Sequence, residues 1–269
     1  MTDQAQPLPP PPQLAQDAFE GLPDKANLAL QPMIVLGLLA GAYIGFGGLF
    51  ATIALAGADA LPFGVGQVLA GFVFTLGLVL VILAGAELFT GNMLLMGPVS
   101  VGQLSLGKAA RALAIVYCAN FVGSLILAAV VLLAGVHESG DGAVGQAALA
   151  LADNKTGNSF MASLASGVLA NMLVCLGVWL ALAGKTVTQK IAGLVLPVAA
   201  FVAAGLEHSV ANMYLLPYAW MVQTVTGDGT AGLTFMAIVG NIVPATLGNM
   251  IGGTLVALAY RQAYIKNGK

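Results

Sequence analysis

The chain has 269 residues, of which 59% are hydrophobic and only 7% are charged, and its mean hydropathy is +0.93. An ordinary soluble domain carries about 25% charged residues, so this composition excludes a soluble globular protein and indicates an integral membrane protein. The net charge of −2 and the absence of a basic patch in the sequence also argue against a nucleic-acid-binding protein.

The N-terminal segment differs from the rest of the chain. The stretch "QPLPPPPQLAQ" from Gln6 is Pro-rich and polar, so we expect residues 1–30 to form an extended or disordered tail. No basic segment leads directly into a hydrophobic one here, which argues against a signal peptide.

Hydrophobic runs predict six membrane spans, because a helix needs roughly 20 apolar residues to cross the hydrocarbon core. Four runs are long enough for one helix each: 33–58, 109–136, 160–183 and 233–260. Two other runs are longer and interrupted: 63–106 and 191–225. We expect each of these two to be one span that is broken in its middle.

Lysine and arginine positions support this count. With six spans, all of the nine lysines and arginines except Lys155 fall on one side, and the opposite loops are mainly acidic. The positive-inside rule then places both termini in the cytoplasm. The predicted domains are a cytoplasmic tail over 1–30, a six-helix transmembrane domain over 31–262 and a cytoplasmic tail over 263–269.

The two halves of the chain align with each other. "GLLAGAYIGFGGLFA" from Gly37 matches "GVLANMLVCLGVWLA" from Gly167, and "NFVGSLILA" at Asn120 matches "NMIGGTLVA" at Asn249. Short matches in Gly/Ala/Leu-rich sequence can arise by chance, but the polar interruptions of the two halves also correspond. Since three spans per half is an odd number, the second half must enter the membrane from the opposite face, as an inverted 3+3 repeat.

The interruptions are "GAELFTGNM" from Gly85 and "GLEHSVANM" from Gly205. They contain Glu87, Glu207 and His208, the ionisable residues that fall well inside the apolar runs. A charge at the middle of the bilayer costs about 3 kcal/mol on insertion scales, and non-helical backbone is tolerated there only inside a bundle or along a cavity. The two interruptions are therefore predicted to line a pore.

The two glutamates have two possible roles. A carboxylate just before a half-helix can accept hydrogen bonds from free backbone N–H groups and favour the positive end of the helix dipole. Direct contact with the substrate is the alternative, and we favour it less because two fixed negative charges would repel an anion. Asn92 and Asn212 are expected to help hold the same two loops, beside Glu87 and Glu207.

His208 stands where the first repeat has Leu88. The charge of imidazole changes near neutral pH, so His208 could pair with an anion or hand it a proton. The alternative is a buried neutral histidine that only bonds a loop carbonyl, and the repeat favours the functional role. Lys155, alone among the acidic outer loops, either draws anions toward a pore mouth or is a solvated loop lysine.

Four motifs together resemble the formate/nitrite transporter family: "GAELFTGNM", "ANMLVCLGVWLA", "FVAAGLEHSVANMYLLP" and "NIVPATLGNMIGGTL". The resemblance extends from about Gly21 to near the C-terminus. It implies a multi-pass inner (plasma) membrane protein that forms homopentamers of six-helix, aquaporin-like protomers, each with its own pore. It also implies passage of small monovalent anions such as formate, nitrite, hydrosulfide, acetate or lactate.

Carried over residue by residue, the resemblance assigns roles to five polar residues. It implies that His208 is the central pore histidine, Thr90 is the matching hydroxyl and Asn171 is a further polar partner. Glu207 matches the acid beside the histidine, and Lys155 matches the outer-loop lysine.

The resemblance also implies two apolar constrictions. Phe74, Leu78 and Phe201 match constriction residues on the cytoplasmic side, and Leu88 and Phe89 match residues toward the outside. The predicted function is passage of weak-acid anions, formate above all, with proton coupling as one possibility. A nitrite or hydrosulfide channel of the same family is the alternative. No cofactor and no metal site are expected.

Proteins of two other classes fit less well. An aquaporin needs two Asn-Pro-Ala loops, and the chain contains no Asn-Pro. An intramembrane hydrolase needs either a nucleophile near its histidine or an H-E-x-x-H zinc motif. The chain contains no Gly-x-Ser-Gly turn for a serine nucleophile, and its two histidines, His137 and His208, do not form H-E-x-x-H, so we do not expect an enzyme.

Overall fold

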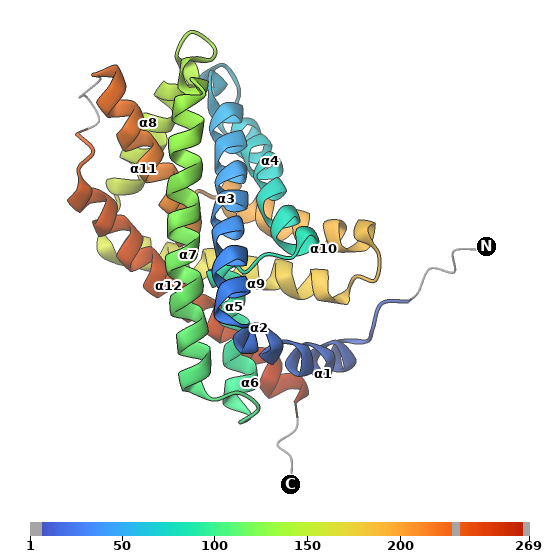
Figure 1. The fold of residues 1–269 in the computed structure, drawn as a ribbon. Helices are drawn as coiled ribbons and strands as arrows, with labels where there is room; N and C mark the ends of the chain where they lie inside the picture. Colours follow the sequence, from blue (N-terminus) through green and yellow to red (C-terminus); the bar gives the residue numbers. More distant parts are fainter. Residues whose placement is uncertain (1–6, 228–231, 266–269) are drawn as a thin grey trace.

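The computed structural model describes residues 7–227 and 232–265, and every regular element within these ranges is a helix (Figure 1). The long helices are α3 (Leu30–Leu55), α4 (Phe63–Ala84), α7 (Leu106–Leu133), α9 (Phe160–Ala183), α10 (Val187–Ala203), α11 (Ser209–Thr226) and α12 (Phe235–Tyr264). The shorter ones are α1 (Pro11–Gly21), α2 (Pro23–Asn27), α5 (Phe89–Asn92), α6 (Met96–Ser100), α8 (Ala143–Thr156), η1 (Ala58–Ala60), η2 (Met93–Leu95) and η3 (Val136–Glu138).

Within the described ranges, five helices are long and apolar enough to cross a membrane: α3, α4, α7, α9 and α12. Helix α10 is also apolar but has only 17 residues. Large apolar side chains stay exposed on these helices, for example Leu133 at 85% and Leu196 at 76%. Such a surface needs lipid or a neighbouring protein to cover it, as in a membrane protein.

Hydroxyl side chains fix where several of these helices begin. Ser105, Ser159 and Thr234 each accept a hydrogen bond from the backbone N–H three residues on, at 3.2–3.3 Å. Thr186 and Gln189 form a full capping box at the start of α10. These caps satisfy N–H groups that have no partner inside the helix.

The chain leaves the helical conformation inside both of the long interrupted runs. Helix α4 ends at Gly85, which has φ +79°, and α5 begins at Phe89. Helix α10 is followed by Gly205, with φ +67°, and α11 begins at Ser209. Glycine adopts this left-handed conformation without steric penalty, which is why each helix stops there.

Glycines let two pairs of helices touch through their backbones. A Cβ atom on Gly123 of α7 would lie 2.0 Å from the Leu38 carbonyl oxygen of α3. A Cβ on Gly252 of α12 would lie 2.1 Å from the Val168 carbonyl oxygen of α9. Small residues at crossings of this kind are typical of helix packing in membranes.

The prediction of a disordered tail over 1–30 is wrong for the part that the structure describes. Helices α1 and α2 pack against α6, α7, α9 and α12 at the same end of the bundle as the C-terminal end of α12 (Figure 1). The prolines occupy the first turn of α1, where no N–H partner is lost. Apolar residues then recur at helical spacing, and Phe19 is only 2% exposed.

The predicted C-terminal tail over 263–269 also begins too early. Helix α12 continues through Tyr264. Residues 1–6 and 266–269 lie outside the described part of the chain.

Candidate functional site

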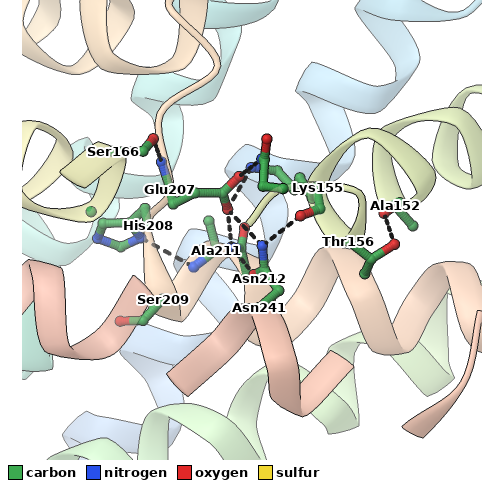
Figure 2. Close-up of polar contacts among 12 residues, drawn as sticks. Ala152, Lys155, Thr156, Ser166, Glu207, His208, Ser209, Ala211, Asn212 and Asn241 are labelled. Carbon is green, nitrogen blue, oxygen red and sulfur yellow. Dashed lines mark hydrogen bonds and ion pairs between the residues drawn. The ribbon is translucent and has the colours of Figure 1, made fainter. Parts of the chain in front are cut away.

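His208 and Thr90, from the two interruptions, meet in the interior. Thr90 Oγ1 lies 2.8 Å from His208 Nε2, and the two residues are 0% and 1% exposed. His208 is also the N-cap of α11, because its Nδ1 accepts a hydrogen bond from the Ala211 N–H at 3.1 Å (Figure 2). A backbone N–H can only donate, so Nδ1 carries no proton and the proton of the neutral ring lies on Nε2, toward Thr90.

Asn171 lies beside this pair and holds the backbone of Thr90. Its Nδ2 donates to the Thr90 carbonyl at 3.1 Å and to the Asn249 carbonyl at 2.6 Å. Cys175 Sγ lies 3.5 Å from the same Thr90 carbonyl. Asn171 Oδ1 is buried and has no hydrogen-bond partner among the described residues, so the site keeps one unused acceptor.

The carboxylate of Glu87 is bound by a lysine and an asparagine side chain. Lys25 Nζ of α2 donates to Glu87 Oε1 at 2.9 Å, and Asn92 Nδ2 donates to Glu87 Oε2 at 2.7 Å. The Glu87 side chain is 7% exposed. Lys25 lies in the segment that was predicted to be a cytoplasmic tail, and its contact with Glu87 was not predicted from the sequence.

Glu207 has an equivalent but more buried environment (Figure 2). Lys155 Nζ lies 3.2 Å from Glu207 Oε2, which also accepts from Asn212 Nδ2 at 2.5 Å and from Asn241 Nδ2 at 3.2 Å. Asn158 donates to the other oxygen at 3.3 Å. With its side chain only 11% exposed, Lys155 is not a solvated loop lysine.

The hydrogen-bond partners of the two glutamates differ from the prediction. The glutamates were expected to accept from the free backbone N–H groups of the half-helices. Their carboxylate oxygens instead bind lysine and asparagine side chains, including Asn92 and Asn212 as expected. The reason is that Lys25 and Lys155, from α2 and α8, reach the loops and provide a charged donor, which binds a carboxylate more strongly than a neutral N–H does.

Asn120 and Asn249 organise the two interruptions. Asn120 Nδ2 donates to the Gly37 and Glu87 carbonyls at 2.8 and 2.9 Å, and its Oδ1 accepts from the Phe89 N–H at 2.9 Å. The contacts with the Glu87 carbonyl and the Phe89 N–H satisfy backbone groups of the helix break, and the contact with the Gly37 carbonyl joins this break to α3.

Asn249 makes the same three contacts in the second half. Its Nδ2 donates to the Gly167 and Glu207 carbonyls at 2.8 and 2.9 Å, and its Oδ1 accepts from the Ser209 N–H at 2.8 Å. The sequence alignment of "NFVGS" with "NMIGG" was the signal for this role, although Asn120 and Asn249 were not among the predicted site residues.

Two cavities lie near the Thr90–His208 pair. One, of about 230 Å³, is lined by Lys25, Lys190, Glu87, Leu78 and Leu88 among others, and we call it the Lys25 cavity. The second, of about 70 Å³, is lined by residues that include Lys155, Phe74, Phe201 and His208, and we call it the Lys155 cavity.

The predicted grouping of the constriction residues is wrong. Leu78 and Leu88 share the Lys25 cavity, whereas Phe74 and Phe201 face the Lys155 cavity with their rings edge to face at 5.5 Å. Phe74 and Leu78 are one turn apart on α4, so they face successive levels. Phe89 lines neither cavity, and its ring packs edge to face on the ring of Tyr117 with 4.8 Å between the ring centroids.

Across residues 7–227 and 232–265, no group of three or more His, Cys, Asp or Glu side chains could hold a metal ion.

Known proteins resemble this chain over almost its whole length. The family model described as "Formate/nitrite transporter" matches residues 12–262. The formate channel FocA of Escherichia coli (strain K12) is 34% identical over 244 residues, covering 86% of each chain. A probable formate transporter of Methanothermobacter thermautotrophicus is 36% identical over 274 residues, covering 94% of this chain and 95% of that protein.

A solved structure agrees with these matches. The structure described as a pentameric formate channel with formate bound superposes with a TM-score of 0.81 at 35% identity, covering 88% of this chain and 98% of that one. Such proteins are membrane channels and transporters and not enzymes. The interior Thr90–His208 pair, the membrane-type helices and these matches lead to one conclusion: the chain belongs to the formate/nitrite transporter family.

Proposed function

We propose that this protein passes small monovalent weak-acid anions, formate above all, across the inner membrane between the Lys25 cavity and the Lys155 cavity. The observation that carries the proposal is the 2.8 Å contact between Thr90 and His208, which come from two separate breaks in helices. The formate channel FocA and the formate-bound pentameric channel support formate as the first anion to test.

We propose an inverted 3+3 repeat of six spans for the architecture. In it, α4 with α5 and α6 forms the broken second span, and α10 with α11 forms the broken fifth span. The matching contacts of Asn120 and Asn249 support this assignment, as do those of Gly123 and Gly252. Broken helices that meet at a repeat interface are the usual site of transport in such folds.

The proposed orientation has both termini in the cytoplasm. The positive-inside distribution of lysine and arginine supports it. Helix α1 and the C-terminal end of α12 also lie at the same end of the bundle, as the orientation requires (Figure 1). The Lys25 cavity is then the cytoplasmic vestibule and the Lys155 cavity the outer one. By analogy with the pentameric formate channel, we propose a homopentamer with one path through each protomer.

Anion selection follows from the lining of the two cavities. Leu78 with Leu88, and Phe74 with Phe201, form the two apolar constrictions, which exclude hydrated cations because a cation cannot replace its water there. Glu87 and Glu207 each lie beside a lysine, so they present little net negative charge to an approaching anion.

The central pair supplies a hydrogen bond in place of the lost water. Because Nδ1 of His208 caps α11, Nε2–H donates to Thr90 Oγ1, which leaves the Thr90 hydroxyl proton free to point at an anion. A chain of two hydrogen bonds polarises this donor. This geometry favours hydrogen-bond donation over proton transfer, since a neutral ring that gave up its Nε2 proton would become an anion itself.

Flux into proteoliposomes tests the proposal. Purified wild-type protein is reconstituted, and the uptake of formate, nitrite, hydrosulfide and lactate is compared at pH 5 to 8. We expect formate uptake well above that of protein-free liposomes. Preferential uptake of nitrite or hydrosulfide would favour the alternative within the family. Equal uptake with and without protein for all four anions would refute the proposed function.

A further inference from the structure

The Lys25 cavity contains a lysine that the site description leaves unused. Lys190 of α10 lines this cavity and is half-buried. Among the described residues, no hydrogen bond or ion pair involves its ammonium group. The carboxylate in the cavity, Glu87, already binds Lys25 through one oxygen and Asn92 through the other.

The local structure fixes the position of Lys190. The Thr186–Gln189 capping box defines the first turn of α10, and the Lys190 N–H donates to the Thr186 carbonyl at 3.0 Å. Gly184 makes room for the lysine, because a Cβ atom there would lie 2.7 Å from Lys190 N and 2.9 Å from Lys190 Cγ. The stem of Lys190 is therefore packed against a turn and is not free in solvent.

The two cavities consequently differ in net charge. In the Lys155 cavity, the charge of Lys155 is balanced by Glu207 at 3.2 Å. In the Lys25 cavity, Lys25 and Glu87 balance each other at 2.9 Å, and Lys190 adds one positive charge without a counter-ion among the lining residues. A vestibule of one sign with low-dielectric walls raises the local concentration of the opposite ion.

We infer that Lys190 recruits the transported anion at the mouth of the Lys25 cavity and sets the apparent affinity for anions that enter from that face. This inference rests on the proposed function and adds a residue that makes the two directions of transport unequal. The ligand class is a small monovalent carboxylate or oxoanion such as formate or nitrite. The attraction acts before the apolar constriction, so it changes the half-saturation concentration more than the maximal rate.

The test compares the two faces of the same protein. Formate flux is measured as a function of formate concentration in vesicles of known orientation, with an N-terminal tag identifying the face that carries the Lys25 cavity. For Lys190→Gln we expect the half-saturation concentration from that face to rise about three- to tenfold, with a weaker dependence on ionic strength. From the opposite face it stays unchanged, and Lys190→Arg behaves as wild type.

Lys185→Gln is the matched control, because Lys185 is an exposed lysine five positions earlier and does not line the cavity. Three results would overturn the inference: Lys190→Gln that matches wild type, equal changes from both faces, or equal changes in the two glutamine variants. Elution of Lys190→Gln at the wild-type assembly size confirms that it folds. If wild-type protein transports formate and Lys190→Gln has the same half-saturation concentration, only this inference is refuted. If wild-type protein transports none of the four anions, the proposed function is refuted as well.

Discussion

At the scale of single residues, one imidazole connects helix capping to the candidate site. His208 uses Nδ1 to begin α11 and Nε2 to contact Thr90, so the backbone determines the tautomer that faces the pair. The family resemblance implied that Thr90 and Asn171 lie beside His208. The sequence by itself indicated His208 as an ionisable residue inside an apolar run. It could not predict the orientation of the ring, which depends on where α11 starts.

Removal of the Thr90 hydroxyl tests the hydrogen-bond donor. Thr90→Val keeps the shape of the side chain but removes the proposed donor to the anion, so formate flux is expected to fall about 10- to 100-fold. Proteoliposome uptake measures this change. Thr75→Val is the matched control, since Thr75 Oγ1 donates to the Phe72 carbonyl within α4. Wild-type flux in Thr90→Val would contradict the assigned role.

Two substitutions of His208 separate folding from transport. Asparagine can still cap α11, whereas alanine cannot, and loss of an N-cap costs about 1 kcal/mol. Thermal unfolding should therefore show His208→Asn near wild type and His208→Ala less stable. Both variants lose the contact to Thr90 that orients its hydroxyl group, so both should lower formate flux throughout the range from pH 5 to 8. Unchanged flux between pH 5 and 8 in both would count against the site.

The two lysine–glutamate pairs are expected to differ in their contribution to stability. Removing one partner of a buried ion pair costs about 3–5 kcal/mol, because the other charge stays buried. The Lys155 side chain is 11% exposed and that of Lys25 is 35% exposed. Lys155→Met should thus lower the unfolding temperature in detergent clearly more than Lys25→Met does. A larger decrease in the unfolding temperature for Lys25→Met would contradict this, because burial of the lysine would then not determine how much each pair stabilises the fold.

At the scale of elements, the apolar runs and the positions of glycines predicted the helices and their breaks, whereas the Pro-rich composition of the N-terminal segment was misleading. The breaks near Gly85 and Gly205 fall within the expected runs, because glycine in a polar stretch ends a helix. The N-terminal helix α1 was not predicted because its prolines indicated disorder, although Leu14, Ala18 and Leu22 recur after them at helical spacing and are buried. The constriction residues were misgrouped because sequence does not give the level of a side chain along a pore.

Helix contacts through glycine give a prediction at the same scale. Gly252→Val would place a side chain against the Val168 carbonyl of α9, so the variant should fail to assemble or unfold at a much lower temperature. Gly240→Val on the same helix is the control, because a Cβ atom at Gly240 meets nothing within 4 Å. Size-exclusion chromatography and thermal unfolding compare the two. Equal behaviour would show that the α9–α12 contact is not close.

At the scale of the whole molecule, the two halves use one set of contacts twice. In each half an asparagine holds a helix break, and a lysine lies near the glutamate of that break. The sequence indicated this duplication through aligned glycines and asparagines. Lys25 and Lys155 also correspond, because each stands 12 residues before the aligned glycines Gly37 and Gly167, but their partners were not predicted. The contacts of these lysines with the glutamates depend on how α2 and α8 fold back onto the bundle.

The most direct test of the account is a structure of the assembled protein at saturating formate. The account predicts formate inside each protomer, between the Lys25 and Lys155 cavities, with an oxygen within hydrogen-bonding distance of Thr90 Oγ1. Formate density confined to the axis between protomers, with nothing beside Thr90 and His208, would contradict it.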